Sequence, residues 1–476
     1  MLIGLFDSMN LWTTNPNSRK GELGKKSVFL SAIMLAAIAL LVLSSVRPVS
    51  SREQASEANQ ILLIVRPLVV MNHSKVQNEE LNLNVTAINA TSLHGFKLNL
   101  SYAAALVNCT DVQEGDLLSA AGNTTMLYTI DNISGNLYVS ANLTSADPTA
   151  SGNGTFVKLT FRVRGEGETL FHLYDVALYD PAGSPLSYVT YDGYFNNKVN
   201  FDFSMPLILL AVTVASVLLN GKVEGRLKGV LEEREFRVRD AVLLVGMMTI
   251  MIGLIVVVRQ LSLILMVLFL FAYSMLLFIF GYIFSKNRWY VGVIAPAIFI
   301  LLYVFFRDSY VWTYYLSNIV GVVFAILITL YLASLFTWKT TAVFGALITG
   351  MDIVLVLITG TMVEAANAAR GLSLPVLVSA PLLPPIVTGN GIILMSLGLG
   401  DFFFAGLLAI QSYKKYGRPF AFLCIIAMTV SFFAFEAFIL TFNVRAFPGT
   451  LMIICGWIPL MLWKQLRNRK TARKNF

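Results

Sequence analysis

Nine apolar segments, each about 16 to 24 residues long, follow one another between residues 204 and 463. A helix needs about 20 consecutive apolar residues to cross a bilayer core, so these lengths predict transmembrane helices. The 56% hydrophobic and 13% charged residues and the mean hydropathy of +0.70 also favour a polytopic membrane protein. The predicted spans are 204–220, 241–258, 261–284, 291–306, 314–336, 341–360, 387–410, 420–440 and 446–463.

The segments outside this core are of three kinds. Residues 1–27 and the basic residues 464–476 are predicted to be cytoplasmic tails. Residues 28–46 form a further apolar run, for which two interpretations stay open: the core of a signal peptide or an uncleaved anchor. Its length, and the lack of a small-residue cleavage site after it, favour an anchor helix.

Residues 47–203 are polar and predict a separate all-β domain. Apolar and polar residues alternate in runs such as Phe156-Val-Lys-Leu-Thr-Phe-Arg-Val, and Gly, Asn and Pro turns separate the runs. This pattern is typical of a β-sandwich. The region also holds nine Asn-x-Ser/Thr sequons, which agree with an extracytoplasmic face.

The polar domain resembles a cohesin module. The resemblance rests on Gly95-Phe-Lys-Leu-Asn-Leu-Ser-Tyr, Val112-Gln-Glu-Gly-Asp-Leu-Leu, the run from Gly152 to Val163, and Asp175-Val-Ala-Leu-Tyr-Asp-Pro-Ala-Gly. Cohesins bind dockerin partners, so the resemblance implies a protein or carbohydrate ligand. A spacer domain without a ligand is the alternative.

The distribution of Lys and Arg predicts the orientation. If the N-terminal tail is inside, the inside segments hold 22 Lys and Arg residues and the short outside loops hold 4. Because cytoplasmic loops carry the basic excess, the sandwich is expected outside and the C-terminus inside the cell membrane. The net charge of +8 therefore comes from basic residues that contact the lipid bilayer and set the orientation of the chain. We expect no nucleic-acid partner.

Two aspartates lie inside predicted spans, where a carboxylate costs about 2.5–3.5 kcal/mol on insertion. Asp352 belongs to the span 341–360 and Asp401 to the span 387–410. Counted from the inner ends of these spans at 1.5 Å per residue, the two aspartates lie about 16 Å and about 14 Å deep. The helices run in opposite directions, so the similar depth allows a dyad.

Such a dyad has a chemical use. Two carboxyl groups a few ångströms apart in low dielectric share one proton, because both cannot ionise together. The ionised member can take a proton from water while the neutral member polarises a peptide carbonyl, and the residues leave open which is which. Gly398 and Gly400 lack side chains, so a substrate backbone can come close to Asp401. On the residues alone, an ion-coupled transporter fits as well as a protease.

Other protease classes are excluded by the histidines. His73, His94 and His172 all lie in the polar domain, so the apolar region holds no histidine base of the rhomboid type and no His-Glu-x-x-His metal site. The three cysteines form neither a disulfide framework nor a zinc site. We therefore expect no metal and no organic cofactor.

The aspartate segments resemble the catalytic helices of signal peptide peptidases and presenilins. Trp338 to Val356 is similar to the first of these helices, and Leu397-Gly-Leu-Gly-Asp-Phe to the second with its Gly-x-Gly-Asp motif. The family has nine spans, so the resemblance implies a nine-helix presenilin-like core over 204–463. It also implies that Asp352 and Asp401 are catalytic and that Gly398, Leu399 and Gly400 shape the site.

Two departures from the family pattern bear on the site. Met351 stands before Asp352 where the family has a tyrosine, so any contact of that hydroxyl is lost. Phe447-Pro-Gly-Thr-Leu stands at the place of the family's Pro-Ala-Leu motif, so the implied substrate-docking role falls on Pro448 and Gly449.

Orientation separates the two branches of this family. Presenilins place the loop between the aspartate helices inside and signal peptide peptidases place it outside, where the charge count places it here. The resemblance then implies hydrolysis of transmembrane helical peptide substrates of type II orientation, such as signal peptide remnants and single-span anchors. The alternatives are a transporter that uses the two aspartates and a catalytically inactive surface protein. We expect Glu436 to reach the outer interface beside Arg445.

Overall fold

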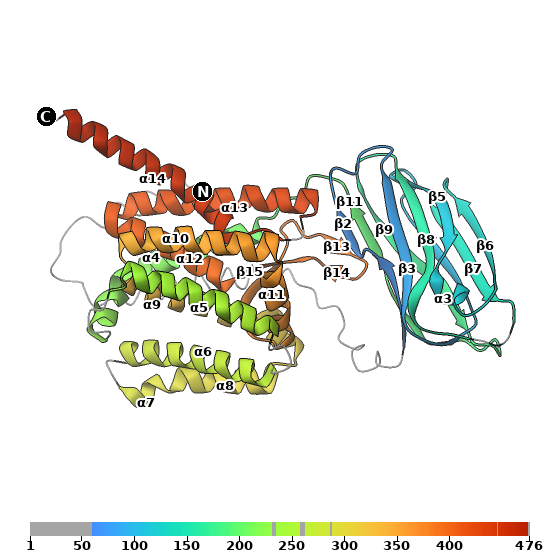
Figure 1. Cartoon of the computed structure of the whole chain (residues 1–476), viewed down its shortest axis with the longest axis horizontal. Coiled ribbons are helices and arrows are strands. Elements are labelled where there is room, and N and C mark those ends of the chain that lie inside the picture. Colours follow the sequence, from blue (N-terminus) through green and yellow to red (C-terminus); the bar gives the residue numbers. More distant parts are fainter. Residues whose placement is uncertain are drawn as a thin grey trace.

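The computed structural model describes residues 60–474, with gaps at 146, 148, 231–234, 258–261, 286–287 and 445. This part of the chain forms an N-terminal β-sandwich followed by a helical region, as predicted (Figure 1). The predicted tail 1–27, the predicted anchor 28–46 and Arg445 lie outside the described residues.

The sandwich is built from two sheets whose strands alternate between buried and exposed side chains. One sheet has the strand order β10-β1-β3-β8-β5 and the other β2-β11-β9-β4-β7-β6. In β7, for example, Leu137, Val139, Ala141 and Leu143 are buried and the residues between them are not. The strands are β1 Ile61–Arg66, β2 Val69–Met71, β3 Glu80–Leu93, β4 Gly95–Ser101, β5 Val107–Glu114, β6 Thr124–Asp131, β7 Asn136–Leu143, β8 Ala150–Val163, β9 Glu168–Tyr179, β10 Tyr188–Tyr191 and β11 Gly193–Asn196, with the short helix α3 Asp116–Ser119 between β5 and β6.

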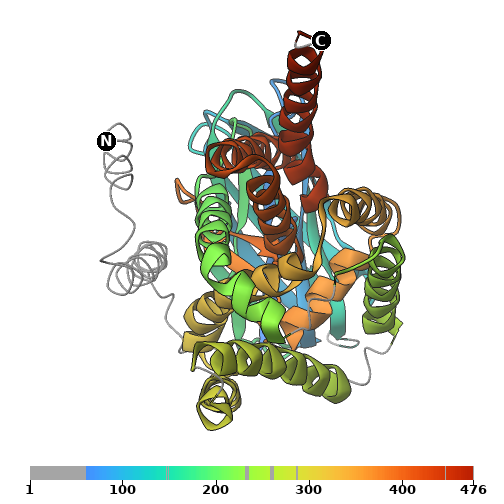
Figure 2. The ribbon, with the colours of Figure 1, turned by 90° about the vertical axis from the view of Figure 1, so that its left-hand side faces the viewer.

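The helical region begins at Ser204, and most of its helices run roughly side by side, with the sandwich beyond one end (Figure 1). Figure 2 looks along these helices and shows the end of α14 projecting away from the others. The helices are α4 Ser204–Val230, α5 Val238–Val257, α6 Ser262–Phe284, α7 Trp289–Gly292, α8 Ile294–Phe306, η4 Trp312–Leu316, α9 Ser317–Leu335, α10 Trp338–Ile353, η5 Val354–Ile358, α11 Thr361–Gly371, α12 Leu399–Tyr416, α13 Arg418–Phe442 and α14 Gly449–Lys474.

Several of these helices are long and apolar enough to cross a membrane. Within the described residues, seven helical stretches satisfy that criterion by length and composition alone. They comprise α4, α6, α7 with α8, η4 with α9, α10 with η5, α13 and α14. Neither α5 nor α12 is among them, and α12 carries Asp401, Lys414 and Lys415 within its 18 residues.

The predicted span 387–410 is wrong over its first part. Residues 377–398 form a two-stranded ribbon, in which β12 Leu377–Pro381 pairs with β15 Leu394–Gly398 and β13 Val387–Thr388 with β14 Gly391–Ile392. Pro384 and Pro385 cannot continue a helix, and the turn Gly389-Asn390-Gly391 reverses the chain. The ribbon projects from the helices toward the sandwich (Figure 1).

Helix α12 lies at the centre of the helical region. Every residue from Phe402 to Ser412 is buried. Because no face of this segment meets solvent, nearly all of its residues are apolar, on every side of the helix. Gly406 packs against Thr329 of α9 so closely that no Cβ fits between them. Helix α12 is therefore enclosed by its neighbours from Phe402 to Ser412.

Candidate active site

Asp352 is the penultimate residue of α10. The helix starts with a capping box in which Thr337 and Thr340 each bond the other's backbone N–H, so its start is fixed by the sequence. From Trp338 to Asp352 the helix rises by about 21 Å at 1.5 Å per residue. The Asp352 side chain is 6% exposed, so α10 delivers a carboxyl group into the protein interior.

Asp401 lies in the first turn of α12. Gly398 is the N-cap residue, which puts Asp401 at the third helical position, where its carboxyl group lies against the backbone of Gly398. The distance from Asp401 to the end of α12 at Tyr416 is about 22 Å at 1.5 Å per residue. Asp352 and Asp401 thus lie at similar distances along their helices from Trp338 and Tyr416, whose rings contact each other at a centroid distance of 5.8 Å.

The beginning of α14 connects the two acids. Thr450 donates from its hydroxyl to Asp352 Oδ2 at 2.6 Å, and its backbone N–H donates to the same oxygen at 3.3 Å. The preceding residue, Gly449, lies against the other acid: an added Cβ would be 2.5 Å from Asp401 Oδ1. Since Gly449 and Thr450 are neighbours, Asp352 and Asp401 lie in one place, and the two carboxyl groups repel each other electrostatically.

Two helix N-termini meet at this pair. Asp401 belongs to the first turn of α12, and the N–H of Thr450 belongs to the first turn of α14. The N-terminus of a helix carries unpaired N–H donors and a partial positive charge. Both helices therefore stabilise a negative charge on the pair, and one charge shared between two carboxyl groups also limits their repulsion.

The remaining predicted residues surround the pair unequally. Leu399 and Pro448 are buried, Met351 is half-buried against the helical core, and the Pro448 carbonyl accepts from the N–H groups of Leu451 and Met452. Gly400 is exposed, and an added Cβ there would meet nothing within 4 Å. A Cβ on Gly398 would be 3.2 Å from Asp401 Oδ2. The glycine that approaches Asp401 most closely is therefore Gly449.

Two buried polar residues depart from the sequence expectations. The sequence interpretation assigned no role to Thr450; its hydroxyl at the start of an apolar helix was the available signal. Glu436 does not reach the outer interface as expected: its side chain is fully buried, and among the described residues neither carboxyl oxygen has a hydrogen-bond partner. Both α4 and α14 pack against α13, the helix that carries Glu436, and the linear sequence does not indicate this packing.

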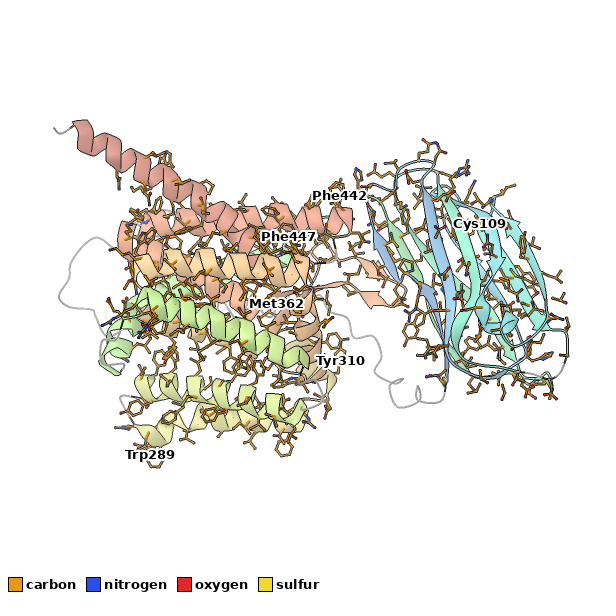
Figure 3. The ribbon with its side chains drawn as sticks, viewed as in Figure 1. Cys109, Trp289, Tyr310, Met362, Phe442 and Phe447 are labelled. Carbon is orange, nitrogen blue, oxygen red and sulfur yellow. The ribbon has the colours of Figure 1, made fainter. Side chains whose placement is uncertain are left out.

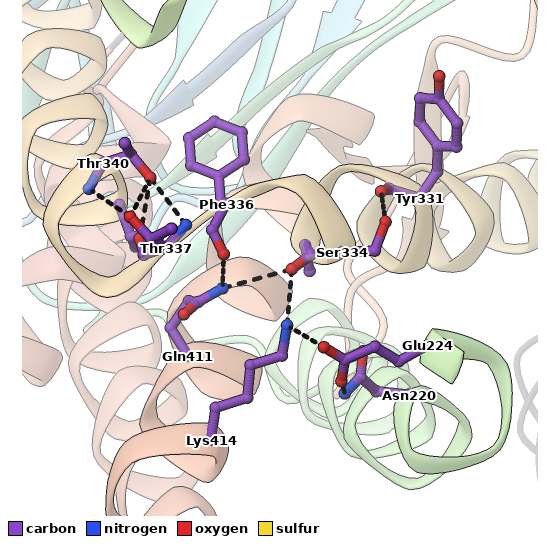
Figure 4. Close-up of polar contacts among 11 residues, drawn as sticks. Asn220, Glu224, Tyr331, Ser334, Phe336, Thr337, Thr340, Gln411 and Lys414 are labelled. Carbon is purple, nitrogen blue, oxygen red and sulfur yellow. Dashed lines mark hydrogen bonds and ion pairs between the residues drawn. The ribbon is translucent and has the colours of Figure 1, made fainter. Parts of the chain in front are cut away.

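The far end of α12 is fixed by a polar cluster (Figure 4). Gln411 donates to the carbonyls of Phe336 at 2.8 Å and Ala333 at 3.3 Å, which are unpaired at the C-terminal end of α9. Lys414 donates to the Ala333 carbonyl and pairs with Glu224 of α4, each at 2.9 Å. This cluster sets the position of α12 along its axis and hence the position of Asp401 relative to α9 and α4.

Metal ligands are not grouped at this site. Among the described residues, no three His, Cys, Asp or Glu side chains come together in a way that could hold a metal ion. The chemistry that this arrangement offers is that of two carboxyl groups, a threonine hydroxyl and helix N–H donors.

Comparison with known proteins bears on the sandwich. Residues 68–196 match the family model of the cohesin domain. The N-terminal sandwich is a cohesin-type domain. This match confirms the predicted cohesin resemblance and leaves the helical region outside it.

Solved structures of cohesins are also similar to this chain. A non-cellulosomal cohesin from Archaeoglobus fulgidus is 21% identical, over 29% of this chain and 89% of that one, with a TM-score of 0.24. A type II cohesin domain from Acetivibrio cellulolyticus is 18% identical, over 29% and 94%, with a TM-score of 0.25. A type I cohesin–dockerin complex from Clostridium thermocellum is 14% identical, over 29% and 92%, with a TM-score of 0.25. No curated protein sequence matches the chain.

Proposed function

We propose that this protein combines a protein-binding cohesin domain with an intramembrane aspartyl endopeptidase. The observation that carries the endopeptidase proposal is the pair of Asp352, which is buried, and Asp401, which is half-buried, joined through Gly449 and Thr450 at the beginning of α14. The match of residues 68–196 to the cohesin family carries the binding proposal. The sequence resemblance to signal peptide peptidases supports the endopeptidase proposal.

The proposed reaction is hydrolysis of a peptide bond by water. One carboxyl group of the pair, in its ionised form, takes a proton from the water as the water attacks the peptide carbonyl. The other, in its neutral form, donates a hydrogen bond to the carbonyl oxygen and then supplies a proton to the leaving amine. The helix N-termini of α12 and α14 stabilise the single negative charge that the pair carries before the attack.

The proposed substrates are transmembrane helices of type II orientation. The proposal rests on the excess of Lys and Arg, 22 against 4, in the segments that lie inside if the N-terminal tail is inside. In that orientation the sandwich and the ribbon 377–398 are extracytoplasmic and the end of α14 is cytoplasmic. Signal peptide remnants and single-span anchors have this orientation.

A cleavage assay tests the endopeptidase proposal. Wild type, Asp352→Asn and Asp401→Asn are purified in detergent and given a fluorescent single-span substrate whose N-terminus corresponds to the inside. The proposal expects wild type to cleave within the apolar segment. Each variant should cleave at least 1,000-fold more slowly, a rise of roughly 4 kcal/mol in activation free energy, because a carboxamide can neither accept nor donate the proton that the two carboxyl groups share. Equal rates for all three proteins would reject it.

The two alternatives give different results in related measurements. A transporter would show proton-linked flux in vesicles and no cleavage. A surface protein with an inactive helical region would bind a partner through the sandwich and show neither flux nor cleavage. Since the family match supports only the binding function, the inactive surface protein is the main competitor.

The binding proposal places the partner on the outer face of the six-stranded sheet. Tyr138 of β7 and Tyr174 of β9 are each 37% exposed there, and Asn99 of β4 lies between them in the register. The ion pair of Lys97 with Asp175, at 3.4 Å, adds charges of both signs beside the tyrosines. Exposed tyrosines among polar groups are typical of protein interfaces.

Binding is tested with the full chain in detergent against immobilised dockerin-type proteins and against polysaccharides. We expect a protein partner, and a Tyr138→Ala, Tyr174→Ala double variant that binds it at least 10-fold more weakly. Binding to polysaccharide alone, or unchanged binding by the double variant, would contradict the proposed partner or the proposed face.

A further inference from the structure

The short hydrogen bond between Thr450 and Asp352 joins a hydroxyl on α14 to one acid of the pair. The Thr450 side chain is 4% exposed and Asp352 is 6% exposed, so water competes little for this contact. The hydroxyl and the backbone N–H of Thr450 both point to the same oxygen, Oδ2. Two donors on one oxygen fix the rotation of the carboxyl group and leave Oδ1 for other partners.

We propose that Thr450 is a positioning residue that orients Asp352 for the aspartyl chemistry. This inference rests on the proposed function. It explains how a chain with Met351 in place of a tyrosine can still hold its first aspartate: the donor comes from α14 across the interface. It also gives the sequence Pro448-Gly449-Thr450 two distinct tasks, with Gly449 making room for Asp401 and Thr450 orienting Asp352.

Three substitutions separate the hydroxyl from the shape of the side chain. Thr450→Val keeps the shape and removes the hydroxyl, Thr450→Ser keeps the hydroxyl, and Thr213→Val is the control. Thr213 is a buried threonine of α4 whose hydroxyl, within the described part of the chain, bonds its own helix at Leu209 and Leu210 and nothing else. We expect kcat to fall about 10- to 100-fold in Thr450→Val with KM nearly unchanged, because a hydrogen bond to a charged group is lost. Thr450→Ser and Thr213→Val should remain within about threefold of wild type.

A second measurement does not depend on activity. The infrared carboxyl bands of Asp352 are identified by difference from Asp352→Asn. They should shift in Thr450→Val and stay in place in Thr450→Ser and Thr213→Val. Unshifted bands, or equal loss of activity in Thr450→Val and Thr450→Ser, would overturn the role of Thr450. If wild type cleaves nothing but the bands shift, the proposed function fails and the positioning contact stands.

A separate observation concerns the ribbon 377–398. At its tip, the Asn390 side chain bonds the backbone of Asp192 twice, accepting from its N–H at 3.0 Å and donating to its carbonyl at 2.6 Å. Gly389 packs on the Asp192 side chain, where an added Cβ would be 2.6 Å from Oδ2. Between β12 and β13, the N–H of Leu383 donates to Asp202 Oδ1 at 2.7 Å. The ribbon is thus held at its tip by the sandwich and, between β12 and β13, by the segment that follows the sandwich.

Apolar contacts reinforce this junction. Met71 and Tyr194 of the sandwich form a buried cluster with Leu382 of the ribbon and Leu440 of α13. The His73 ring contacts Phe442 edge-on at a centroid distance of 6.4 Å, and Figure 3 shows Phe442 at the end of the helical region that faces the sandwich. The returning strand β15 ends at Gly398, the N-cap of the helix that carries Asp401.

We infer that the sandwich braces the ribbon and thereby holds the beginning of α12 in place, so that it forms part of the aspartate site's framework. The side chain of Asp192 links the ribbon tip to the outer face of the six-stranded sheet, because its Oδ2 accepts from His172 Nδ1 at 2.7 Å. His172 lies on β9 beside Tyr174, with the rings stacked at 6.2 Å. A partner bound beside Tyr174 would therefore lie next to His172, which bonds the residue that holds the ribbon tip.

Hydrogen exchange in the full chain tests this brace without any need for activity. Asn390→Ala is compared with Asn82→Ala, an exposed asparagine on β3 away from the junction. We expect amides of 377–398 to exchange at least 10-fold faster in Asn390→Ala and at the wild-type rate in Asn82→Ala, because two hydrogen bonds at the tip are lost. Unchanged exchange in both variants would refute the brace, whether or not the protein proves to be a protease.

Discussion

Replacing Gly449 by alanine is the perturbation whose effect the structure specifies most closely. The added Cβ would lie 2.5 Å from Asp401 Oδ1 and 2.6 Å from Asp401 Cγ, whereas ordinary contacts begin at 3.4 Å. The carboxyl group or the start of α14 must therefore shift by about 1 Å, a displacement that can cost about 100-fold in rate. The family that the helices resemble carries alanine at this position, so the resemblance and the geometry predict opposite results.

The assay is cleavage of the fluorescent single-span substrate by purified Gly449→Ala, with Gly246→Ala as the matched control. Gly246 lies on the exposed side of α5, where an added Cβ meets nothing within 4 Å. We expect kcat to fall about 100-fold in Gly449→Ala and to stay within about twofold in Gly246→Ala. Full activity of Gly449→Ala would refute the close approach of α14 to Asp401.

Three further predictions concern stability and reactivity. The pKa of Asp131 is lowered by hydrogen bonds from Ser134 and Ile133, so these contacts stabilise the sandwich at neutral pH and stop doing so as the pH falls through that lowered pKa. Asp131→Asn should therefore lower the unfolding temperature at pH 7 but not at pH 2. Burial raises the pKa of Cys109 to about 11, so iodoacetamide at pH 8 should label it only after unfolding. Gln411→Leu should cost about 1–3 kcal/mol of stability in detergent, because the Phe336 carbonyl loses its donor.

Each of these has a clear contrary result. An Asp131→Asn effect of the same size at pH 2 and pH 7 would show that the charge is not responsible. Rapid labelling of Cys109 in the folded chain would contradict its burial at 2% exposure. Gln411→Leu with wild-type stability would show that the cluster at the end of α12 is not a clamp.

The sequence predicted the sandwich and most helices because their signals are local. Alternation in β7 and β8 and long apolar runs such as that of α13 each follow from the environment of one element. The ribbon 377–398 was missed because its residues are nearly as apolar as a span, and only its prolines and glycines distinguish it. Its stability comes from the sandwich, which is distant in sequence.

The site was predictable in part for a similar reason. A carboxylate in an apolar run is conspicuous, so Asp352 and Asp401 stood out, and counting residues placed them at similar depths. The role of Thr450 was not predictable from spacing, because it depends on where α14 begins relative to α10. The burial of Glu436 likewise depends on the packing of α4 and α14 against α13.

The most direct test of the central proposal is cleavage of a single-span substrate in heavy-oxygen water, followed by mass spectrometry of the products. If Asp352 and Asp401 activate water, wild type should release a fragment whose new carboxyl terminus lies within the apolar segment and carries one heavy oxygen atom. Asp352→Asn and Asp401→Asn should release none. Unlabelled fragments from wild type would contradict the account. Labelled fragments from both variants, in the same amount as from wild type, would also contradict it.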